Sequence, residues 1–89
     1  MECEVSFFGG VFEAADGTKS AKVSFKGNTL GGLLDQVKKR WPKTADYIDG
    51  PKSGAVVFVL NGISLRDSDP DRVLSKGDEL SIIHLISGG

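Results

Sequence analysis

The chain has 89 residues, a formal net charge of −1 and 39% hydrophobic residues. A chain of this length builds one small core and leaves little room for a deep catalytic cleft. The near-zero charge gives no bulk attraction to nucleic acid or to an anionic membrane. No apolar run approaches the roughly 20 residues that span a bilayer. The start of the chain lacks the features of a secretion signal, which predicts a cytoplasmic protein.

The first part of the chain predicts a hairpin. Residues 3–8 and residues 21–26 each alternate between apolar and polar side chains, as half-buried strands do. The connection over residues 11–19 is longer than a tight turn needs, so we expect a loose hairpin.

A helix is predicted after this hairpin. Apolar side chains recur every three or four residues from Leu30 to Trp41, which is one stripe of an amphipathic helix. Thr29 or Asn28 can cap its start by accepting a hydrogen bond from a free backbone N–H. Pro42 ends it.

The second half of the chain predicts three further strands. Residues 43–54 form a connection rich in glycine, proline and charge. Residues 55–60 are apolar on both faces, and the Asn61-Gly62 turn leads into a short return strand over residues 63–65. The last strand is predicted over residues 79–86.

These elements predict an α+β domain in which one helix packs across a mixed sheet of four to five strands. The domain is expected to span residues 1–86, and residues 87–89 are expected to form a flexible tail.

Catalytic and metal-binding motifs are not convincing. The glycines of residues 27–32 lack the Gly-Lys-Ser/Thr ending of a phosphate-binding loop. The aspartates within residues 67–71 lack the glycine and the final glutamate of a calcium loop. Cys3 and His84 are the only residues of their types, so neither a metal cluster nor a nucleophile–base pair is supported. We expect His84 to be an ordinary strand histidine near a sheet edge. We predict no catalytic residue, no metal and no bound cofactor, and therefore a protein that is not an enzyme.

The sequence ends with an apolar strand followed by Ser87, Gly88 and Gly89. Glycine has no Cβ and serine has only a small side chain, so Ser87 and Gly88 can thread a narrow channel and present the carboxylate of Gly89 to another protein. An ionised carboxylate is a poor electrophile and must first be activated, for instance as a mixed anhydride with AMP. This ending predicts a carrier, in which a partner recognises the folded domain and Gly89 reacts.

The order of elements, the Asn61-Gly62 turn and the terminal Gly88-Gly89 resemble the ubiquitin-like β-grasp sulfur carriers. Two branches of that family compete. Phe8-Gly9-Gly10 and the helix end at residues 37–39 are similar to the ubiquitin-related modifier that carries sulfur for tRNA thiolation. The final four residues, 86–89, are closer to the ending of the molybdopterin synthase small subunit. We favour the modifier branch and keep the molybdopterin branch as the alternative.

The resemblance implies a reaction cycle and a set of partners. A ubiquitin-activating-type enzyme would use ATP to adenylate Gly89, and a sulfurtransferase would convert the adenylate into a thiocarboxylate. The charged carrier would then serve a tRNA thiolase or the large subunit of molybdopterin synthase. Covalent attachment to lysines of target proteins is a second role, and a non-covalent β-grasp interaction module is a third.

A partner-binding patch is predicted on the face of the sheet that points away from the helix. Strand alternation turns four apolar side chains to this face if their neighbours are buried: Val57, Val59, Ile83 and Leu85. Exposed patches of this kind commonly mark partner surfaces. The alternative is that the connection 43–54 covers this face. Replacing Val59 with Asp is expected to weaken docking on the activating enzyme while leaving the fold intact.

Overall fold

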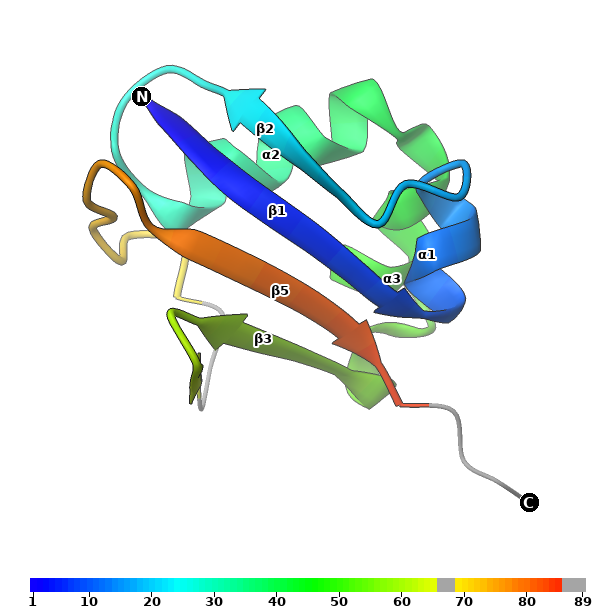
Figure 1. Ribbon diagram of the computed structural model, residues 1–89. Coiled ribbons are helices and arrows are strands. Elements are labelled where there is room, and N and C mark those ends of the chain that lie inside the picture. Colours follow the sequence, from blue (N-terminus) through cyan, green and yellow to red (C-terminus); the bar gives the residue numbers. More distant parts are fainter. Residues whose placement is uncertain (66–68, 86–89) are drawn as a thin grey trace.

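The computed structural model describes residues 1–65 and 69–85 of the chain. A mixed sheet of five strands in the order β2-β1-β5-β3-β4 forms its centre (Figure 1). The strands are β1 (Glu2–Gly9), β2 (Ser20–Ser24), β3 (Val56–Leu60), β4 (Ile63–Ser64) and β5 (Glu79–His84). The α+β prediction with a mixed sheet is therefore confirmed.

Strand β5 lies in the middle of this sheet. It runs parallel to β1, with Glu4 opposite Glu79 at one end and Gly9 opposite His84 at the other. Its other neighbour, β3, is antiparallel to it, and β2 and β4 form the two edges. The last part of the described chain is thus held on both sides by backbone pairing.

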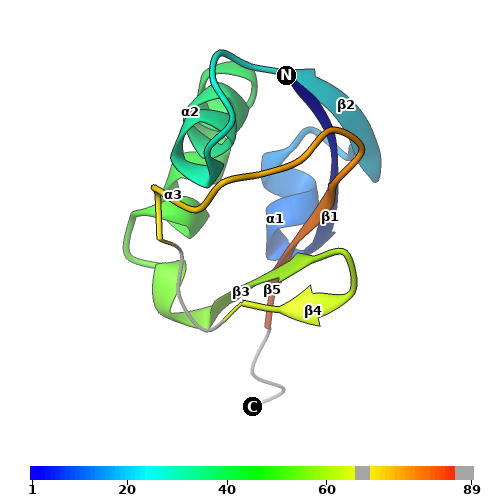
Figure 2. The same cartoon turned by 90° about the vertical axis from the view of Figure 1, so that its left-hand side faces the viewer.

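All helices pack on one face of the sheet (Figure 2). The longest is α2 (Leu30–Arg40), and two short helices, α1 (Gly10–Ala14) and α3 (Ala45–Ile48), accompany it. Single 3-10 turns, η1 (Pro42–Thr44) and η2 (Ser53–Ala55), flank α3. Thr29 caps α2 as predicted, because its side-chain oxygen accepts a hydrogen bond from the Gly32 N–H at 3.2 Å.

The core lies between α2 and the sheet. Phe7 of β1 and Trp41 at the end of α2 meet edge to face, with ring centroids 4.9 Å apart. Almost completely buried side chains come from the sheet, from α2 and from the loop before β5, and they include Val5, Leu30, Leu33, Val37, Leu74, Leu80 and Ile82. The described residues contain no helix long and apolar enough to cross a membrane.

Two predicted loops differ from the structure. The connection expected to be loose contains α1, which buries Val11 and Ala14 against the sheet. The connection over residues 43–54 contains α3, whose Tyr47 is buried and whose neighbours include α2. This connection therefore packs on the helix-bearing face.

Candidate functional site: the open face of the sheet and the end of strand β5

Three apolar side chains form a row across the face of the sheet that carries no helix. Phe8 of β1 lies opposite Ile83 of β5, and Ile83 lies opposite Val57 of β3. Figure 1 views this face, with α2 and α3 behind the strands. Phe8 is 50% exposed, whereas Ile83 and Val57 are partly buried. The row is an apolar surface available for contact with a partner.

The other residues of the predicted patch lie around this row. Val59 is partly buried and belongs to the next row of the sheet, opposite Ser81. Leu85 follows the end of β5 and is 57% exposed. We call the five side chains Phe8, Val57, Val59, Ile83 and Leu85 the apolar face.

Sequence reasoning missed Phe8 as a member of this face. The signal was present, because Val5 and Phe7 of the same strand are buried in the core and alternation turns Phe8 to the opposite side.

The chain leaves the sheet beside the apolar face. The N–H of Leu85 donates a hydrogen bond to the carbonyl oxygen of Ala55 at 2.8 Å, so the chain is still held by its neighbour one residue past β5. The predicted carrier residue Gly89 and the threading residues Ser87 and Gly88 lie outside the described residues.

His84 lies at the end of the central strand, between Gly9 of β1 and Val56 of β3. The expectation that it is a histidine near a sheet edge is wrong, because β5 is flanked on both sides. Its ring packs edge to face against Tyr47, with centroids 4.8 Å apart.

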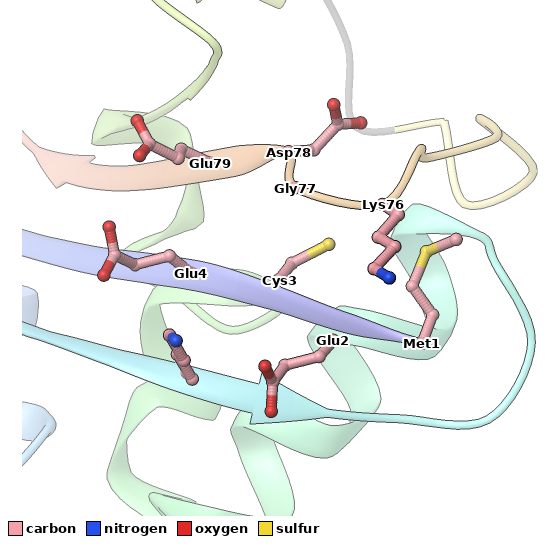
Figure 3. A pocket seen from close by; sticks show the side chains of 9 residues that line it. Met1, Glu2, Cys3, Glu4, Lys76, Gly77, Asp78 and Glu79 are labelled. Atoms are coloured by element: carbon pink, nitrogen blue, oxygen red, sulfur yellow. The ribbon is translucent and has the colours of Figure 1, made fainter.

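A hollow at the opposite end of β1 and β5 is lined by residues 1–4, Lys22 and residues 76–79 (Figure 3). Cys3 is only 2% exposed there, and burial raises the pKa of its thiol, with a further contribution from the charge of Asp78. The thiol is therefore protonated at neutral pH and is a poor nucleophile. Among the described residues, no group of three or more His, Cys, Asp or Glu side chains could hold a metal ion.

A mixed sheet with its last strand in the centre, helices on one face and an apolar strip on the other is the arrangement of a small ubiquitin-like domain. The ThiS family matches residues 5–89. The chain therefore belongs to this family of ubiquitin-like sulfur carriers and modifiers. Comparison with curated proteins finds no match.

Solved structures support the same fold. SAMP1 from Haloferax volcanii is 25% identical, with a TM-score of 0.82 and full coverage of both chains. Urm1 from Trypanosoma brucei is 22% identical, with a TM-score of 0.72, over 99% of this chain and 95% of that one. A chain of the complex between subunits 1 and 2 of the molybdopterin-converting factor from Helicobacter pylori is 21% identical, with a TM-score of 0.64 and full coverage of both chains. The predicted ubiquitin-like β-grasp fold is confirmed.

Proposed function

We propose that this protein is a sulfur carrier whose Gly89 carboxylate is activated and converted to a thiocarboxylate, for use in tRNA thiolation. The observation that carries the proposal is the position of the strand end. Strand β5 ends with His84 at the border of the apolar face. The next residue, Leu85, is exposed and lies two positions after Ile83 of the same face. A partner that grips the apolar face is then placed to receive the following residues.

The chemistry requires two transfers at one carbonyl carbon. An oxygen of the Gly89 carboxylate attacks the α-phosphorus of ATP, which releases pyrophosphate and leaves an acyl adenylate. The terminal sulfur of a persulfide on a sulfurtransferase then attacks the carbonyl carbon and expels AMP, which gives an acyl disulfide. A thiol supplies the two electrons that cleave the sulfur–sulfur bond, and the thiocarboxylate is released together with a mixed disulfide.

The domain supplies recognition to this cycle, while the partner supplies catalysis. The apolar face would dock on the ubiquitin-activating-type enzyme, because buried apolar and aromatic anchors carry most of the energy of such contacts. A protein of this fold does assemble with a partner protein, as the two-subunit complex from Helicobacter pylori illustrates. That complex also supports the alternative in which the partner is the large subunit of molybdopterin synthase.

A second candidate function is covalent attachment of Gly89 to lysines of other proteins. It is favoured by the likeness to SAMP1, a small archaeal modifier protein. Both functions begin with the same adenylate and differ only in the nucleophile that attacks it.

The test is adenylation by the ubiquitin-activating-type enzyme of the same organism, followed as exchange of labelled pyrophosphate into ATP. We expect exchange with the full chain and none with a chain that lacks Gly89 and Gly88. Equal exchange with both chains, or none with either, would contradict the proposal. Sulfur transfer and lysine conjugation are then separated by mass spectrometry of the products.

A further inference from the structure

A tight contact of four residues closes the end of strand β5. The His84 ring lies against the ring of Tyr47, and His84 pairs with Gly9 across the sheet. Gly10, the first residue of α1, lies against both rings. We call Gly9, Gly10, Tyr47 and His84 the strand-end clasp.

The residues of the clasp approach so closely that only glycine fits at positions 9 and 10. Gly9 has a φ of +76°, a left-handed conformation that favours glycine, and a Cβ there would overlap the carbonyl oxygen of His84. A Cβ on Gly10 would lie 2.6 Å from Nδ1 of His84 and 3.0 Å from the hydroxyl oxygen of Tyr47. A side chain at either position would therefore push His84 away from the sheet.

Stability alone does not explain the histidine. Its Nδ1 is buried and has no hydrogen-bond partner among the described residues. A buried polar atom without a partner is unfavourable for folding, and an aliphatic side chain would fill the position without that penalty. The clasp therefore holds a histidine at a position where an aliphatic side chain would stabilise the fold more.

We infer that the strand-end clasp is a positioning device for the reactive tail, with His84 and Tyr47 as its positioning residues. The inference rests on the proposed function. The clasp holds His84 from the helix-bearing side, and the hydrogen bond from the Leu85 N–H to the carbonyl oxygen of Ala55, the residue before β3, holds the next residue. Together they fix the point from which the chain departs, next to the apolar face on which the partner docks.

A fixed position of Leu85 helps Gly89 to reach the active site of the partner, because few residues follow Leu85. The four residues after Leu85 span at most about 13–14 Å when fully extended. If the clasp opens, His84 and Leu85 lose their fixed positions at the end of the sheet. Their backbone must then be ordered again when the tail enters the active site of the activating enzyme. The ordering of one residue corresponds to about a 5- to 30-fold loss in the productive population.

The clasp and the apolar face should therefore affect different kinetic constants. A change in the apolar face weakens docking and raises KM for the carrier. Opening the clasp leaves docking intact and lowers kcat, because fewer docked molecules present Gly89 correctly.

The experiment measures pyrophosphate exchange with His84→Ala, Tyr47→Leu and the conservative Tyr47→Phe, which keeps the ring that contacts His84. Leu34→Ala serves as the matched control, because it truncates a buried core residue of α2 that is not part of the clasp. We expect kcat to fall at least about 5-fold in His84→Ala and Tyr47→Leu with KM within about 2-fold of wild type. Tyr47→Phe and Leu34→Ala should keep the wild-type kcat.

Hydrogen exchange of the Leu85 amide gives a second readout that needs no enzyme. The amide should exchange faster in His84→Ala and Tyr47→Leu and at the wild-type rate in Tyr47→Phe. The inference is overturned if His84→Ala keeps the wild-type kcat, if it raises KM alone, or if Leu34→Ala lowers kcat equally. Wild-type protein that supports no exchange of pyrophosphate would instead overturn the proposed function, and the positioning role with it.

Discussion

Phe8 and Ser6 lie two residues apart on β1 and on the same face of the sheet, but they belong to different rows. Phe8 continues the row of Ile83 and Val57, whereas Ser6 lies opposite Ser81. Substitutions at these two positions can therefore distinguish the loss of an apolar contact from the addition of a charge on the same strand.

We predict that Phe8→Asp weakens binding to the activating enzyme by about 30-fold or more, because an aromatic anchor at the centre of an interface contributes about 2 kcal/mol or more. Calorimetric titration measures this change. Ser6→Asp introduces the same charge outside the apolar row and should change the affinity by less than about 5-fold, since charges at an interface rim contribute little. Equal losses in the two variants would show that the apolar row is not the docking surface.

The helix α2 begins at a single side-chain hydrogen bond, from the Gly32 N–H to Thr29. We predict that Thr29→Ala lowers the free energy of unfolding by about 1 kcal/mol, because one N–H of the first turn loses its acceptor. Urea unfolding measures the loss. Thr29→Ser keeps the oxygen and should lose less than half as much. A Thr29→Ser loss as large as that of Thr29→Ala would mean that the methyl group, rather than the cap, stabilises the helix start.

Most elements that the sequence predicts have a long local pattern, and the two-residue β4 is instead predicted by the Asn61-Gly62 turn before it. The strands at the start of the chain and α2 each show several repeats of their period, and the structure places them at β1, β2 and α2. Helices α1 and α3 have five and four residues, which is about one turn each, too short for a helical period to be visible. Their positions are set by burial of Val11 and Tyr47 against the rest of the fold.

The candidate site also has one part that local sequence predicts and one part that it does not. Alternation along two strands identified four members of the apolar face from local sequence, and the same rule would have found Phe8. The clasp could not be found in this way, because it joins residues that are far apart in the sequence. The parallel pairing of β1 with β5 brings Gly9 to His84, and the packing of α3 brings Tyr47 against the His84 ring. Local sequence likewise does not show that the strand of His84 is central.

The core and the proposed recognition surface lie on opposite faces of one sheet. Leu33 is completely buried between α2 and the sheet, and Leu85 is 57% exposed beside the apolar face. We predict that Leu33→Ala lowers the free energy of unfolding by about 2–5 kcal/mol, through lost burial and the cavity left behind. Leu85→Ala should lower it by less than about 0.5 kcal/mol.

The effects of these two substitutions on binding should be the reverse of their effects on stability. Leu85→Ala should weaken docking on the activating enzyme, whereas Leu33→Ala should bind normally at a temperature where it is still folded. Unfolding by urea and calorimetric titration on the same two samples check both halves. A stability loss in Leu85→Ala as large as that in Leu33→Ala would contradict the separation of the two faces.

We propose above all that the chain carries sulfur on its last residue. Fragmentation mass spectrometry of the protein purified from its own cells under non-reducing conditions tests this most directly, because it locates a modification on a single residue. The account predicts a population in which one oxygen of the Gly89 carboxylate is replaced by sulfur. Protein whose C-terminal residue is always an unmodified carboxylate, or whose added sulfur lies only on Cys3, would contradict it.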